Sequence, residues 1–201
     1  IENGVIREIT DGGRLPQGSE EADTVVDAEG KLVTPGLVEG HTHMVFGGYR
    51  QHEIPMKLKG AGYLDILRAG GGILDTVRKT REAGFEELYG KTEGFLDEMM
   101  ALGVTTCEAK SGYGLDFDTE LKQLRVMADL NDEHPIDVVS TYFGGHVTPA
   151  EYTHQTDDYI TYMIEKVLPE LRLERSVTFC DVYCDQGLFS LRQTERLLRA
   201  A

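Results

Sequence analysis

The sequence predicts an α/β fold built on a parallel sheet. From residue 35 onward, short apolar strand patterns alternate with helical patterns, and four such units follow one another. Consecutive units of this kind imply parallel strands joined by right-handed crossovers. An open doubly wound sheet and a (β/α)₈ barrel both satisfy the pattern. A barrel needs about 250 residues and eight strands, so if the fold is a barrel, these 201 residues supply its first half and we expect a fragment of a longer protein.

Residues 1–34 predict a different kind of structure. Short strand-like pieces at Val5–Ile6, Thr24–Asp27 and Lys31–Thr34 are separated by turn formers such as Asp11-Gly-Gly. A few short strands cannot cover their own apolar face. We therefore divide the chain into a partial β segment, 1–34, and an α/β region, 35–201.

The elements of the α/β region follow from local patterns. Apolar residues between Ile160 and Leu171 recur at the spacing of a helix with one buried face. Ser190 and Gln193 form a capping-box signature that opens the last helix, where an N-cap contributes about 1 kcal/mol. The predicted strands cover residues 36–43, 104–110, 136–143 and 177–184, and further helices begin near residues 64, 73, 86 and 118.

Composition excludes several classes of partner. Lys and Arg number 20 against 35 Asp and Glu, a formal net charge of -15, so the chain repels phosphate backbones and nucleic acid is not expected as a partner. No run of about eighteen apolar residues is present, so no membrane span is expected, and we expect a cytoplasmic protein. Homo-oligomerisation is left open. The odd set of three cysteines is expected to be reduced, and a zinc site at Cys180 and Cys184 would lack a second cysteine pair.

Two histidines stand at the end of the first predicted strand. His41 and His43 are two residues apart, so on an extended segment they point to the same face and can converge on one metal ion. Neutral imidazole suits zinc or iron. The alternative is a pair of solvated histidines at a strand terminus, and the spacing alone does not decide between the two.

Other polar groups follow the predicted strands, where parallel α/β sheets place their sites. Tyr113 lies in a glycine-flanked loop after the second strand, and His146 follows the third. Arg50, in the loop leaving the two histidines, is either a bidentate clamp for a carboxylate or a solvated loop residue. A chain with a net charge of -15 would need such a clamp to hold an anionic substrate. The glycine run at 69–72 favours a flexible turn over a phosphate loop, because the Gly-Lys-Ser/Thr ending is missing.

Together these motifs resemble a known family. The stretch Pro35-Gly-Leu-Val-Glu-Gly-His-Thr-His43 is similar to the first-strand metal motif of the amidohydrolase superfamily, which are metal-dependent hydrolases on a (β/α)₈ barrel flanked by a small β-sandwich. Within that superfamily the ordered motifs narrow the resemblance to the imidazolonepropionase family. The supporting stretches are His41–Arg50, Ala69–Ile73, Ala101–Thr106, Glu108–Leu115, Thr119–Lys122, Gly144–His146 and Asp181–Asp185.

The resemblance implies a fold and an activity. The fold is the first half of a (β/α)₈ TIM-type barrel preceded by part of a small β-sandwich domain. The activity is hydrolysis of the cyclic amide of imidazolone propanoate, a small anionic substrate, to N-formimino-L-glutamate in histidine degradation. By position, His41 and His43 match two ligands of one divalent ion, zinc or iron. The residues matched to substrate binding are Arg50, Tyr113 and His146.

The same resemblance implies that this sequence holds an incomplete site. The family's remaining metal ligands and its acid/base residue are expected beyond Ala201. We therefore expect the parent protein to be the enzyme and the 201 residues alone to be inactive. Two alternatives stay open: another cyclic amidohydrolase or an aminohydrolase of the same superfamily, and a non-catalytic half-barrel binding module.

Overall fold

The computed structural model describes residues 1–11, 18, 22–62, 65–66, 69–174 and 177–201. The chain divides into two compact units, Ile1–Pro35 and Gly36–Ala201. Within the described residues, all named strands and helices belong to the second unit. In chain order they are β1 (Leu37–Thr42), η2 (Gln51–Glu53), α1 (Ile54–Leu58), α3 (Ile73–Glu82), α4 (Phe85–Ala101), β2 (Val104–Lys110), α5 (Phe117–Glu133), β3 (Asp137–Gly145), η3 (Ala150–Tyr152), α6 (Thr156–Tyr162), η4 (Met163–Val167), α7 (Leu168–Leu171), β4 (Phe179–Val182) and α8 (Leu191–Ala200).

The strands form one parallel sheet in the order β1-β2-β3-β4. Each strand pairs with the next strand in the chain, and the order never reverses. A doubly wound sheet reverses its strand order at a switch point, so that alternative is wrong. The arrangement is that of four consecutive units of a (β/α)₈ barrel, which confirms the predicted half-barrel.

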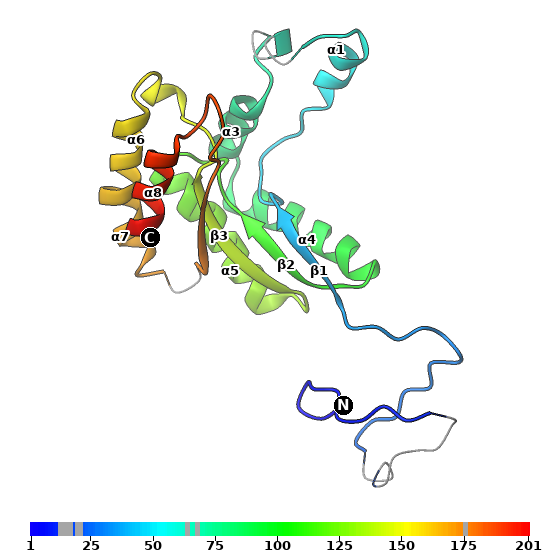
Figure 1. Cartoon of the computed structure of the whole chain (residues 1–201). Helices are drawn as coiled ribbons and strands as arrows, with labels where there is room; N and C mark the ends of the chain where they lie inside the picture. Colours follow the sequence, from blue (N-terminus) through cyan, green and yellow to red (C-terminus); the bar gives the residue numbers. More distant parts are fainter. Residues whose placement is uncertain (12–17, 19–21, 63–64, 67–68, 175–176) are drawn as a thin grey trace. The chain divides into compact units, whose positions relative to one another are not determined.

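Helices cover one face of this sheet. Figure 1 shows α4 and α5 lying along the strands. Side chains alternate between the two faces of a strand, and Cys107 and Ala109 of β2 are fully buried on the helix-covered face. Glu108 and Lys110 alternate with them, so they lie on the opposite face, which is the inward face of a barrel. The core also contains Leu88, Leu96, Leu124, Met127, Leu130, Tyr142, Ile160 and Met163.

The predicted helical periodicity after β3 is confirmed. Buried residues of α6, η4 and α7 follow the predicted stripe, including Ile160, Met163, Val167 and Leu171. The run is not uniform, because η4 is a π-helix between two α-helical segments. The Ser190–Gln193 capping box at the start of α8 is also confirmed. Across the described part of the chain, no helix combines the length and the apolar character that crossing a lipid bilayer requires.

One predicted strand is shorter in the structure, and one predicted helix lies largely outside the described residues. The strand predicted over 177–184 is limited to Phe179–Val182, because β4 has a neighbour on one side only and its pairing with β3 shifts register between Tyr142 and Gly145. The helix predicted from near residue 64 falls largely outside the described residues, since 63–64 and 67–68 are among those not described.

The described residues of 1–34 form no named strand. In the described residues of this unit, the only β pairing is an isolated antiparallel bridge between Glu2 and Val5. The apolar residues Val25, Val26 and Leu32 are 78%, 82% and 89% exposed. Extended segments become a stable layer only with partner strands and a covered apolar face. The described residues of Ile1–Pro35 provide neither, and the assignment of 1–34 to a partial β-sandwich segment stays a prediction.

Candidate functional site

Three aromatic rings gather where β1, β2 and β3 end. His43 directly follows β1, Tyr113 lies in the loop after β2, and His146 follows β3. The ring centroids of His43 and His146 are 4.7 Å apart, and the rings are stacked. The Tyr113 ring lies 5.4 Å from His43 and 5.2 Å from His146. The carboxyl ends of neighbouring parallel strands meet at one edge of the sheet, so three predicted site residues form one cluster.

His43 is a neutral imidazole with its proton on Nδ1. That nitrogen lies 3.1 Å from the backbone oxygen of Ser111, and a carbonyl oxygen can only accept, so Nδ1 donates. Burial lowers the pKa of His43 to about 4, and the neighbouring His146 is the next largest cause. The lone pair on Nε2 is therefore available. This is the form in which an imidazole binds a metal ion.

His41 lies beside His43 but is exposed to solvent. Their ring centroids are 5.4 Å apart. In the described residues, no three or more His, Cys, Asp or Glu side chains are grouped so that they could hold a metal ion. The chemistry of the pair fits two members of a zinc or iron donor set, and such a set requires further ligands.

His146 is the most deeply buried ring of the cluster. It is 7% exposed, and its Nδ1 lies 3.0 Å from the backbone oxygen of Gly112, to which it must donate. Burial lowers the pKa of His146, although the Gly112 carbonyl works in the opposite direction. The Phe143 ring stacks on it at 4.8 Å. His146 is therefore a neutral, fixed imidazole whose Nε2 can accept a hydrogen bond.

Arg50 supplies positive charge to this cluster from the loop after β1. Its side chain is 34% exposed, and its Nε lies 3.9 Å from the Glu53 carboxylate. Burial raises the pKa of Tyr113, and the charge of Arg50 opposes that rise. Burial lowers the pKa of His146, and Arg50 adds to that lowering. The guanidinium is thus near enough to act on both residues, as a carboxylate clamp would require.

The glycine run at 69–72 lies at the start of α3, where an anion could in principle bind. The backbone N–H of Gly72 donates to Glu53 Oε1 over 2.7 Å, and Glu53 is only 2% exposed. A carboxylate from the chain itself therefore occupies the position that a phosphate would take. The structure agrees with a turn rather than a phosphate loop.

The cysteines do not form a metal site or a disulfide. Cys107, Cys180 and Cys184 are all free. Burial raises the pKa of the Cys180 thiol to about 12, which disfavours the thiolate that a metal ion needs. Among the described residues, no further His, Cys, Asp or Glu side chains join the two cysteines near β4 into a group of possible metal ligands.

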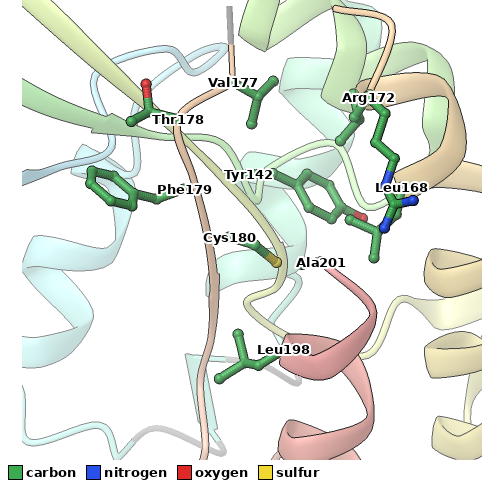
Figure 2. A pocket seen from close by; sticks show the side chains of 10 residues that line it. Tyr142, Leu168, Arg172, Val177, Thr178, Phe179, Cys180, Leu198 and Ala201 are labelled. Carbon is green, nitrogen blue, oxygen red and sulfur yellow. The ribbon is translucent and has the colours of Figure 1, made fainter. Parts of the chain in front are cut away.

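A surface groove of about 340 Å³ lies away from the histidine cluster. Figure 2 shows it between the start of β4, α7 and the end of α8. It contains none of the predicted site residues. Its walls are formed by Tyr142, Leu168, Leu171, Arg172, Val177, Thr178, Phe179, Cys180, Leu198 and Ala201.

Curated relatives match the chain over most or all of its length. The imidazolonepropionase of Parabacteroides distasonis is 56% identical over 176 residues, which are 88% of this chain and 42% of the relative. Those of Treponema denticola and Clostridium tetani are each 47% identical over 100% of this chain, which spans 49% and 48% of their lengths. The chain resembles imidazolonepropionase. No family model matches it.

The similarity to imidazolonepropionases agrees with the resemblance predicted from the motifs. The chain spans about half the length of the curated relatives it matches. The structure brings His41, His43, Tyr113 and His146 together and places the charge of Arg50 near them. The roles assigned to these residues stay predictions.

Sequence reasoning missed the groups that orient the cluster of His43, Tyr113 and His146. The carbonyls of Ser111 and Gly112 hold the two imidazoles, and the side chain of Glu120 holds the loop to which both carbonyls belong. Glu120 lies in the Thr119–Lys122 stretch that supported the resemblance, but nothing in its spacing indicates that it reaches back to that loop. A polar residue at an otherwise apolar helix position is the one signal that marks it.

A second missed feature is a charged network on the inward face of the sheet. Lys110 Nζ lies 2.7 Å from Glu108 Oε1 and 3.0 Å from Asp181 Oδ2. Burial disfavours the charged lysine, but the two carboxylates raise the pKa of Lys110 overall. Thr141 donates to Glu108 over 2.5 Å. The network links β2, β3 and β4 directly below the strand ends that carry the cluster.

Proposed function

We propose that the complete enzyme, formed from this chain and the remaining length found in its relatives, hydrolyses the ring amide of imidazolone propanoate to N-formimino-L-glutamate. The observation that carries the proposal is the cluster of His43, Tyr113 and His146 at three neighbouring strand ends, with Arg50 beside it. Relatives that cover the chain bear the name of this enzyme. In the reaction, water adds across the ring C–N bond, which breaks, and the leaving nitrogen takes up a proton.

His41 and His43 would hold one zinc or iron ion together with ligands from outside the described residues. When bound, a divalent ion lowers the pKa of a water molecule from 15.7 to about 7 and so supplies a nucleophile near neutral pH. His43 is prepared for this role because its proton is on Nδ1, bonded to Ser111, and its pKa is lowered to about 4. A ligand that is already neutral and oriented does not have to lose a proton when the metal binds.

The other residues would bind and orient the substrate. Arg50 is suited to the propanoate carboxylate, since a guanidinium can make two charge-assisted hydrogen bonds to it. His146 presents a neutral Nε2 to a ring N–H, and the Tyr113 hydroxyl adds a polar contact opposite it. Because the chain carries a net charge of -15, the field of the whole molecule opposes an anion and Arg50 must overcome it locally. A cytoplasmic location and the oligomeric state remain predictions.

The test is a chimera in which this chain replaces the matching segment of the Treponema denticola imidazolonepropionase. All 201 residues of this chain match that segment, which is 49% of the Treponema protein. Purified with zinc or iron supplied, the chimera should convert imidazolone propanoate to N-formimino-L-glutamate, measured by mass spectrometry. The unmodified Treponema denticola protein is the positive control. Circular dichroism and metal analysis establish that the chimera is folded and loaded.

Three results would contradict the proposal. A folded, metal-loaded chimera that makes no product would overturn it. Faster turnover of another cyclic amide or of an amino-substituted ring would favour a different hydrolase of the same superfamily. A folded chimera that takes up no metal under metal-replete conditions would favour a non-catalytic module.

A further inference from the structure

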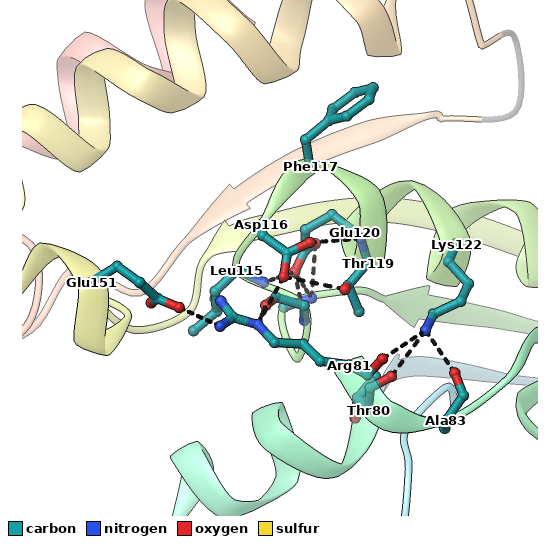
Figure 3. A network of polar contacts seen from close by, with 12 residues as sticks. Thr80, Arg81, Ala83, Leu115, Asp116, Phe117, Thr119, Glu120, Lys122 and Glu151 are labelled. Carbon is teal, nitrogen blue, oxygen red and sulfur yellow. Dashed lines mark hydrogen bonds and ion pairs between the residues drawn. The ribbon is translucent and has the colours of Figure 1, made fainter.

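A single buried carboxyl group holds the loop after β2. Glu120, in the first turn of α5, is 1% exposed. Its Oε1 accepts from the backbone N–H groups of Gly114 and Leu115 over 2.9 and 2.8 Å, and its Oε2 accepts from that of Gly112 over 3.1 Å. The Ser111 side chain also bonds to it. Figure 3 shows dashed lines converging on Glu120 beside Leu115.

The loop held in this way carries the groups that orient the site. The Ser111 carbonyl accepts from Nδ1 of His43, and the Gly112 carbonyl accepts from Nδ1 of His146. Tyr113 itself is the next residue. The backbone is in the left-handed region at Gly112, with φ +99°, and at Leu115, with φ +57°. At Leu115, which is not a glycine, this conformation costs about 1 to 3 kcal/mol, so the loop needs bonding partners to keep it.

Neither apolar packing nor an ion pair explains why a carboxyl group is buried at position 120. Among the ion pairs of the described residues, none involves Glu120. Burial disfavours its ionised form, and the loop donors oppose this effect only in part, so its pKa is raised. Burying a carboxyl group is costly without hydrogen bonds. The hydrogen bonds that offset this cost come from the N–H groups of the loop. The conformation of the loop therefore depends on the position of Glu120 in α5.

We propose that Glu120 is a positioning residue for the candidate site. By accepting the backbone N–H groups of the loop Ser111–Leu115, it directs the carbonyls of Ser111 and Gly112 at the two imidazoles. This keeps His43 and His146 protonated on Nδ1 and leaves both Nε2 lone pairs for ligands. The inference rests on the proposed function only where it calls the cluster a site. The orientation of the two imidazole rings follows from the hydrogen bonds of this chain alone.

The experiment compares the 201-residue chain with its Glu120→Gln variant, without metal or substrate. The amide has nearly the same volume and keeps one acceptor for Gly114 and Leu115, but its NH₂ group faces the N–H donor of Gly112. Long-range ¹H–¹⁵N correlation spectra report which ring nitrogen of each histidine carries the proton. We expect Nδ1–H in the wild type and a mixture of tautomers for His43 and His146 in the variant. Amide exchange at Gly112 should accelerate by about tenfold or more.

The matched control is Leu130→Val, which removes one methylene from a fully buried residue of the same helix. It should lower stability without changing either tautomer or the exchange of Gly112. A positioning role is overturned if Glu120→Gln leaves both histidine tautomers and the Gly112 exchange unchanged, or if Leu130→Val changes them equally. If the tautomers shift but the chimera described above makes no product, the positioning role stands and the proposed function fails.

Discussion

The loops after β1 and β2 both lead site residues away from the sheet, but they are held in opposite ways. In the loop after β1, five carbonyl oxygens accept from side chains of the surrounding helices: those of Met44, Val45, Phe46, Gly48 and Tyr49. Gln123 donates to Val45 over 2.6 Å, and Lys91 donates to Phe46 and Gly48 over 2.9 Å each. In the loop after β2, backbone N–H groups donate to one carboxyl group. The loop after β2 has other contacts as well, since Arg81 donates to the Gly114 oxygen over 2.8 Å and the Ser111 N–H donates to the Thr141 oxygen over 3.0 Å. Three of its N–H groups nevertheless share the one carboxyl group of Glu120, whereas the anchors of the first loop come from several side chains.

Further contacts strengthen the loop after β1. Gly47 N–H donates to the buried hydroxyl of Thr80 over 2.9 Å, and Lys91 Nζ lies 3.4 Å from the centroid of the Phe46 ring. The difference teaches that the two predicted substrate contacts, Arg50 and Tyr113, have unequal support. Loss of the Glu120 carboxylate should affect three N–H groups around Tyr113 at once. The loop that carries Arg50 should tolerate the loss of any one anchor.

The largest expected effect comes from Gly112→Ala in the loop after β2. A Cβ there would lie 2.7 Å from the Phe143 oxygen and 3.0 Å from the His146 Cβ, on a backbone with φ +99°. Strain and overpacking together should lower the free energy of unfolding by about 2 to 5 kcal/mol. Urea denaturation measures this loss. Gly103→Ala is the matched control, since Gly103 has φ +91° but nothing within 4 Å of an added Cβ, so equal losses would show that the close contact is unimportant.

The next largest effect concerns the function of the loop after β1. Arg50→Ala in the chimera removes the proposed carboxylate clamp, and a charge-assisted hydrogen bond contributes about 1.5 to 3 kcal/mol. We expect kcat/KM for imidazolone propanoate to fall by about tenfold to more than a hundredfold. Arg50→Lys should retain part of the rate, because it keeps the charge without the bidentate geometry. An unchanged rate in the alanine variant would remove Arg50 from the substrate site.

A smaller effect is expected where anchors are redundant. Thr80→Val removes the acceptor of the Gly47 N–H while keeping the volume of the side chain. Leaving this donor unsatisfied should cost about 1 to 2 kcal/mol of unfolding free energy, measured by urea denaturation. The histidine tautomers should not change, because Lys91 and Gln123 still hold the loop. A shift of the His43 tautomer in this variant would show that the two loops are not held independently.

The smallest effect is a pH dependence at Lys91. Burial lowers its pKa from the ordinary 10.5 to about 8, and Glu87 opposes this in part. Between those pKa values the unfolded chain binds more protons than the folded one, so stability rises with pH across that window. Relative to Lys91→Met, the wild type should gain stability between about pH 8 and about pH 10.5. A relative loss would mean that the carbonyls and the Phe46 ring keep the lysine charged.

Much of the fold could be predicted because it depends on local pattern. The strand Val104–Lys110 was predicted with the bounds that the structure has, and the stripe from Ile160 to Leu171 and the Ser190 cap also follow from neighbouring residues alone. The strands predicted within residues 1–34 are not formed in the described residues and stay a prediction, because they do not depend on local pattern alone. Strands depend on partners far along the chain, and the described residues of that unit contain none.

By itself, the sequence determined which chemical groups stand at the strand ends, because the alternation of strands and helices puts His43, Tyr113 and His146 at the same edge of a parallel sheet. Only the tertiary structure decided how those groups are oriented. The proton on Nδ1 of each imidazole, and the loop conformation that keeps it there, depend on Glu120, whose bonds to the loop leave no periodic pattern in the sequence. Periodicity records which face of an element is buried, whereas a hydrogen bond between a helix and a loop depends on the angle at which the two meet.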